Sequence, residues 1–154
     1  MTRFFSGNSL VARFDRLLRK RSFEKVAANV LCTAPLRIQG TSPLFLSMIC
    51  HRDLAYYLLA IKSIYARVKQ GRVLIINDGS LTSTDVKQLS YHIPGIEIVN
   101  KQSISVGPAP RADLFWERLV KIVDLTRDNY VIQVDADTLR HSTKDVTNVA
   151  KDFG

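Results

Sequence analysis

The chain lacks several features that would assign it to a class of protein at once. It has no apolar run near the roughly 20 residues that span a bilayer. Its most apolar early segment, Val26–Leu36, is short and contains Asn29 and Thr33, which makes it unconvincing as a signal peptide. The only cysteines are Cys32 and Cys50, without a CxxC pair or a His/Cys cluster. Neither a disulfide framework nor a zinc site is indicated, and a reducing compartment is favoured.

Acidic residues are scarce near the N-terminus, where most of the net charge of +8 is found. Residues 1–40 carry 8 Lys and Arg against 2 Asp and Glu, so their charge is 8 − 2 = +6, which leaves 8 − 6 = +2 for the rest. The high isoelectric point therefore belongs to a basic leader. It is poor support for nucleic-acid binding by the folded part, and we expect no nucleic-acid partner.

The leader, which we place at residues 1–42, is predicted to be helical. Residues 1–21 have the spacing of a basic amphipathic helix, with Leu10, Phe14 and Leu17 on one face. Two interpretations stay open: a helix packed on the domain with a solvated basic face, or a helix on an anionic membrane surface or in a transit peptide. A further short helix is expected near Phe23–Leu31.

From residue 43 onward, apolar runs of strand length alternate with segments of helical spacing. Strands are expected at Leu44–Cys50, Arg72–Asn77, Ile96–Val99 and Tyr130–Asp135. Helices are expected from Asp53 as cap to Gly71, from Ser83 or Thr84 through Leu89, from Asp113 as cap through Leu125, and over 144–153. This order predicts one α/β domain over 43–154, with a Rossmann-like, open, mostly parallel sheet and helices on both faces.

Two aspartates, Asp135 and Asp137, follow the fourth expected strand. Two carboxylates held together repel each other unless a cation lies between them, and Mg²⁺ or Mn²⁺ binds to one or two carboxylates plus phosphate oxygens. The pattern indicates a metal site at the carboxyl end of the sheet. The alternative is a pair of solvated turn aspartates.

Asp78 occupies the corresponding place after the second strand, followed by Gly79 and Ser80. A carboxylate there is suited to accept hydrogen bonds from a base N–H or ribose hydroxyls. An Asx turn that simply ends the strand is an equally weighted alternative.

The order of these segments, with N-D-G-S at residues 77–80 and D-A-D-T-L at residues 135–139, resembles glycosyltransferases of the GT-A fold. The resemblance covers Leu44–Leu139. It implies a nucleotide-sugar-binding half in which Asp135 and Asp137 hold Mn²⁺ or Mg²⁺ and the diphosphate, and Asp78 contacts the nucleotide.

The resemblance also implies roles for residues around these motifs. Residues 50–52 would lie near the base, and Arg111, chosen over Arg118 and Lys121, would bind a donor phosphate in a bidentate way. We expect a UDP-sugar as donor and an unidentified acceptor. The expected location is cytoplasmic, with peripheral contact at the inner membrane surface through residues 1–21 as an option.

The chain departs from the family in length, because only Arg140–Gly154 follow the motif. We therefore expect an incomplete, donor-binding half, and turnover is not expected if the protein ends at residue 154. Two alternatives stay open. One is a non-catalytic α/β module associated with a membrane through its leader. The other is a haloacid-dehalogenase-type phosphatase, although that family places its D-x-D after the first strand.

Overall fold

The computed structural model describes residues 27–107 and 114–136. Their elements are η1 (Asn29–Cys32), β1 (Leu44–Ile49), η2 (His51–Asp53), α2 (Leu54–Val68), β2 (Arg72–Asn77), α3 (Ser83–His92), β3 (Glu97–Asn100), η3 (Lys101–Ser103), α4 (Leu114–Leu125) and β4 (Val131–Gln133). The helix expected at residues 1–21, the cap Asp113 and the helix expected at 144–153 lie outside the described residues.

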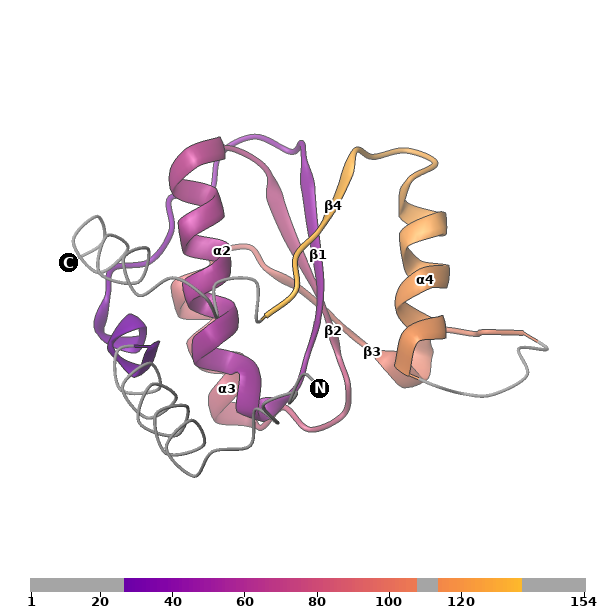
Figure 1. Ribbon diagram of the computed structural model, residues 1–154, viewed down its shortest axis with the longest axis horizontal. Helices are drawn as coiled ribbons and strands as arrows, with labels where there is room; N and C mark the ends of the chain where they lie inside the picture. The colour runs from indigo at the N-terminus through magenta and orange to yellow at the C-terminus, as the bar shows by residue number, and fades with distance from the viewer. Residues whose placement is uncertain (1–26, 108–113, 137–154) are drawn as a thin grey trace, which may run out of the picture.

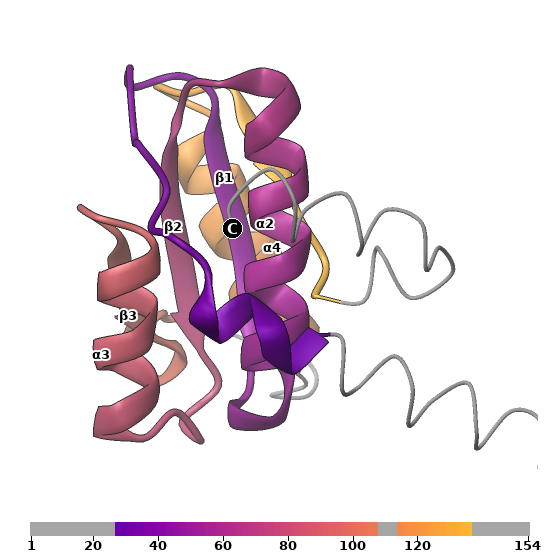
Figure 2. The ribbon, with the colours of Figure 1, turned by 90° about the vertical axis from the view of Figure 1, so that its left-hand side faces the viewer.

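The four strands form one open sheet in the order β3-β2-β1-β4, and all neighbouring pairs are parallel. Helices α2 and α3 cover one face of the sheet and α4 covers the other (Figures 1 and 2). The predicted Rossmann-like α/β fold is confirmed, since helices cross from one parallel strand to the next and lie on both faces.

Alternate side chains of the central strands supply the two halves of the core. Phe45 and Ile49 pack toward α2 together with Val73 and Ile75 of β2. The intervening residues, Leu44, Leu46, Leu74 and Ile76, form a second cluster that meets α4 through Ile122 and Leu125. Because β1 is covered on both faces, its sequence is nearly continuously apolar and shows no alternation with polar residues.

The strands are placed close to their expected positions, with small differences at their ends. β3 runs from Glu97 to Asn100, one residue later than expected, and β4 stops at Gln133. The chain nevertheless stays beside β1 after Gln133, because the Val134 N–H donates to the Leu46 carbonyl at 2.9 Å. The Ser47 hydroxyl also donates to the Val134 carbonyl at 2.7 Å. These two hydrogen bonds hold the chain beside β1 as far as Val134, the residue before Asp135.

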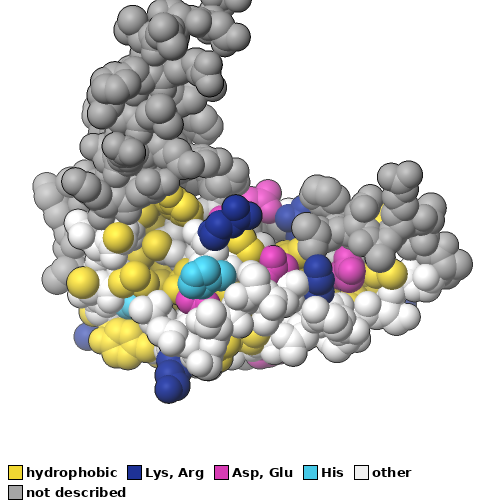
Figure 3. Space-filling view, turned by 90° about the horizontal axis from the view of Figure 1, so that it is seen from below, with side chains coloured by type: hydrophobic (Ala, Val, Ile, Leu, Met, Phe, Trp, Pro, Cys, Tyr) yellow, Lys and Arg dark blue, Asp and Glu magenta, His cyan; other side chains and the backbone are white. Residues whose placement is uncertain are grey.

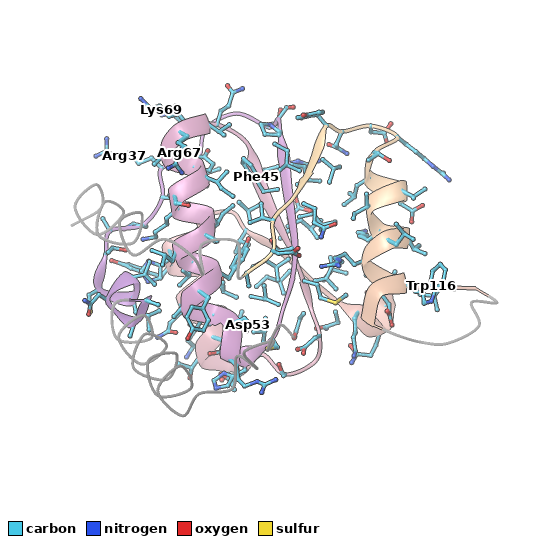
Figure 4. All side chains as sticks on the ribbon, viewed as in Figure 1. Arg37, Phe45, Asp53, Arg67, Lys69 and Trp116 are labelled. Carbon is cyan, nitrogen blue, oxygen red and sulfur yellow. The ribbon has the colours of Figure 1, made fainter. Side chains whose placement is uncertain are left out.

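The expected start of α2 is confirmed, but its expected end is wrong. Asp53 stands at the N-cap position, where Figure 4 places it at the lower end of the helix, but its side chain makes no capping bond. Its carboxylate accepts from the Cys50 thiol instead. At the other end the helix stops at Val68, and Lys69 with φ 61° is its left-handed cap.

Gly71 is required for a different reason from the one the sequence suggested. A Cβ at this position would lie 2.4 Å from the carbonyl oxygen of Pro43, and its φ is +114°. The glycine therefore permits close approach of the chain that enters β2 to the chain that enters β1.

The described part of the expected leader belongs to the packed structure. Ala27, Val30 and Leu36 are buried against the helices on the α2 face. The Gly71 N–H also donates to the Gln39 carbonyl. By contrast, Trp116 on α4 is 37% exposed and points away from the sheet in Figure 4.

Candidate functional site

The strand order defines one place at the edge of the sheet where open α/β folds commonly bind ligands. From β1 the chain proceeds to β2 and β3 on one side, and after β3 it crosses through α4 to β4 on the other side of β1. The strand order therefore reverses at β1, which has β2 on one side and β4 on the other. In open α/β sheets ligands bind outside the carboxyl ends of the strands at such a switch point. Residues 50–53 and 134–136 border it here.

Polar and charged side chains gather at this end of the molecule. Figure 3 views the edge where the strands stop, and histidine, acidic and basic side chains lie close together on it. We call this surface the carboxyl edge; it comprises His51, Asp53, Asp78, Ser80, Asp85, Arg118 and Asp135.

Asp135 lies at the edge, directly after the stretch of chain that pairs with β1. Its Oδ1 accepts a hydrogen bond from the Arg118 guanidinium at 2.9 Å and another from the Gln133 amide at 3.2 Å. The side chain is 55% exposed, so the ion pair is accessible to water. Arg118 comes from α4, whose position on the sheet therefore determines what Asp135 contacts.

The other two expected ligand-binding residues of this region, Asp137 and Arg111, lie outside the described residues. Arg118, another of the three basic candidates, contacts Asp135; the preferred candidate, Arg111, stays a prediction. A helical register would have favoured Arg118, because it lies in the second turn of α4 and on the side that meets the sheet edge.

Asp78 forms the turn that the alternative interpretation described. Its Oδ1 accepts from the Ser80 N–H at 2.8 Å and from the Ser80 hydroxyl at 2.6 Å. Gly79, with φ +105°, sits so close to Gln102 that a Cβ would lie 2.9 Å from its Nε2. The glycine allows the turn to fold tightly, and Asp78 is held at the carboxyl edge in a fixed conformation.

Two hydrogen bonds fasten the Asp78 turn to the end of β1. The His51 N–H donates to the Ser80 hydroxyl at 2.9 Å. The Asp78 N–H donates to the Ile49 carbonyl at 3.3 Å. The loops after β1 and β2 therefore form one unit, which faces the Asp135 segment across the switch point.

A histidine–carboxylate pair, absent from the sequence analysis, lies in this unit. His51 Nδ1 is 2.7 Å from Asp85 Oδ2, and the side chains are 57% and 5% exposed. The same Asp85 oxygen accepts from the Thr82 N–H and hydroxyl, both at 2.7 Å. The pattern Thr82-x-x-Asp85 is that of a helix capping box and predicts where α3 begins. Nothing in the sequence predicts that His51 meets it.

The pKa of Asp85 is set by opposing influences. Burial alone would raise it, but the backbone N–H of Thr82 and the His51 imidazole outweigh burial and hold the pKa below its ordinary value. Asp85 is therefore a carboxylate at neutral pH, and it is fixed by three donors.

Comparisons with known proteins identify no relative. No protein-family model, curated protein or solved structure matches the chain significantly. Function has to be argued from the carboxyl edge itself.

The described residues fit a divalent metal in part. Among them no cluster of three or more His, Cys, Asp or Glu side chains is placed to hold a metal ion. Asp135 supplies one exposed carboxylate. A single carboxylate together with substrate phosphate oxygens is a coordination pattern that Mg²⁺ accepts, because it keeps several waters and takes few protein ligands. A metal here would be held jointly by the protein and a phosphorylated ligand.

No helix in the described parts of the chain has both the length and the apolar character needed to cross a membrane.

Proposed function

We propose that the carboxyl edge binds a nucleoside diphosphate sugar together with Mn²⁺ or Mg²⁺, and that the chain is the donor-binding part of a glycosyltransferase. Asp135 and Asp137 are the residues that would hold the metal and the diphosphate. Asp78 would contact the nucleoside. The metal supplies positive charge that stabilises the diphosphate as it leaves the sugar.

The observation that carries this proposal is the reversal of strand order between β1 and β4. It places Asp135 on one side of the switch point and the fastened loops of β1 and β2, with Asp78, on the other. A nucleotide lying across the edge would reach both sides, with its nucleoside near Asp78 and its diphosphate near Asp135.

The Arg118–Asp135 pair also suits a ligand that carries negative charge. With no ligand bound, the guanidinium neutralises Asp135. When the carboxylate turns to a divalent cation, the guanidinium is left beside the diphosphate, and its planar array of N–H groups matches two phosphate oxygens. Arg118 would then bind phosphate, alone or together with Arg111, for which the resemblance implies the same role.

Calorimetric titration of UDP in the presence and absence of Mn²⁺ tests the proposal. We expect binding that requires the metal and that falls at least tenfold in Asp135→Ala and in Asp137→Ala. The matched control is Asp124→Ala, which removes an exposed carboxylate from α4 and should leave the dissociation constant unchanged.

Two results would contradict the proposal. One is the same affinity for UDP with and without the metal. The other is an equal loss of UDP affinity in Asp124→Ala and Asp135→Ala. That result would indicate that affinity depends on the total charge of the protein and not on a site at the carboxyl edge.

A further inference from the structure

The contact between His51 and Asp85 fixes which ring nitrogen of His51 carries a proton. Asp85 is ionised at neutral pH and has no proton to donate. The 2.7 Å contact between Nδ1 and Oδ2 is therefore a hydrogen bond in which Nδ1–H donates and the carboxylate accepts. In the neutral imidazole the lone pair is then on Nε2. His51 offers a hydrogen-bond acceptor at a defined place on the carboxyl edge.

The accessible part of His51 lies on the nucleoside side of the proposed site. The Asp85 side chain is only 5% exposed, whereas that of His51 is 57% exposed. The His51 backbone is tied to Ser80, the hydroxyl that also binds Asp78. The proposed diphosphate position, at Asp135, follows β4 on the other side of β1. His51 therefore lies on the side of the switch point where the base or ribose would lie, and Asp135, with the proposed leaving group, lies on the other side.

We propose that His51, oriented by Asp85, selects the nucleobase by accepting a hydrogen bond at Nε2 from a ring N–H, which favours uracil over cytosine. This inference rests on the proposed function. Uracil carries a hydrogen on N3, whereas cytosine has a lone pair there. Two acceptors that face each other repel, so the same geometry that binds UDP disfavours CDP.

The experiment measures the dissociation constants of UDP and CDP in the presence of Mn²⁺ under the same conditions. Because both nucleotides carry the same diphosphate and ribose, the ratio of their affinities isolates the contribution of the base. We expect UDP to bind about five- to tenfold more tightly than CDP, the size of effect for one hydrogen bond.

Substitutions at one position provide the controls. His51→Asn retains an N–H for Asp85 but has nothing at the place of Nε2, so it should lose the UDP preference. His51→Gln restores a carbonyl oxygen near that place and should recover part of the preference. Asp85→Asn should weaken the preference. If it fails to fold because α3 loses its cap, the two His51 variants decide the matter.

Equal affinity for UDP and CDP, or a preference that survives in His51→Asn, would overturn this inference while leaving the proposed function intact. Failure of both nucleotides to bind in a metal-dependent way would instead overturn the proposed function, and this inference with it.

Discussion

At the scale of single residues, Lys62 is the most unusual side chain of the core. It lies on α2 and is completely buried. Its ammonium donates to the Thr33 hydroxyl at 2.6 Å, to the Ala34 carbonyl at 2.5 Å and to His92 Nδ1 at 3.2 Å. Lys62 thereby connects α2 to the segment before β1 and to the end of α3. The burial of a charge is tolerated here because acceptors surround it.

Burial lowers the pKa of Lys62 to about 8 from 10.5. Between these values the unfolded chain binds more protons than the folded one, so the free energy of unfolding should rise with pH across this window. The expected slope from this one group is at most about 1.4 kcal/mol per pH unit. Urea denaturation at several pH values between 8 and 10.5 measures it.

Lys62→Met is the matched variant, because it keeps the aliphatic length and removes the titrating amine. Its free energy of unfolding should lack the contribution of Lys62 to the slope. If wild type and Lys62→Met change in parallel across the window, Lys62 titrates as an ordinary lysine and the argument from burial is wrong.

At the scale of elements, α3 is defined by its first turn. The Asp85 N–H donates to the Thr82 hydroxyl at 3.2 Å, while the Asp85 carboxylate accepts from the Thr82 N–H at 2.7 Å. This reciprocal pair is a capping box. It also holds Asp85 in the position from which it reaches His51, so the start of this helix and the geometry of the carboxyl edge depend on the same side chains.

Thr82→Ala should therefore lower the free energy of unfolding by about 1 kcal/mol, the usual value for loss of an N-cap hydroxyl. Thr84→Ala is the control on the same helix. Thr84 is exposed, and its replacement should change stability by no more than about 0.5 kcal/mol. Chemical denaturation of both variants provides the comparison. Equal effects of the two substitutions would show that the capping bond contributes nothing measurable.

The boundaries of elements show where local sequence is sufficient and where it is not. The start of α3 and the position of β1 depend on residues that are close together in the sequence: Thr82 and its partner Asp85, and the apolar run of β1. Both could therefore be predicted to within a residue. Gly71 was assigned to the end of α2 because glycine commonly ends helices. Its actual constraint is the carbonyl of Pro43, a contact between segments that no local pattern reveals.

At the scale of the whole molecule, the sheet order creates the site. The sequence predicted parallel strands and polar residues at their ends, and therefore that Asp78 and Asp135 would meet at one edge. It could not predict that β4 lies beside β1 or that Arg118 reaches Asp135. Nor could it predict the His51–Asp85 contact. The first two depend on which side of β1 the chain returns to after α4, and the His51–Asp85 contact depends on how α3 packs against the loop after β1. Both are decided by packing of the complete fold.

The central claim is that a metal and a nucleoside diphosphate bind together at the carboxyl edge, and paramagnetic broadening of backbone amide signals by Mn²⁺ tests it most directly. With UDP present, Mn²⁺ should broaden the signals of Val134, Ala136 and His51, and should leave Gln39 and Gly71 at the opposite edge sharp. Mg²⁺ with UDP is the diamagnetic control. The account would be contradicted by broadening that is the same with and without UDP. It would also be contradicted by broadening that affects Gln39 and Gly71 as strongly as Val134.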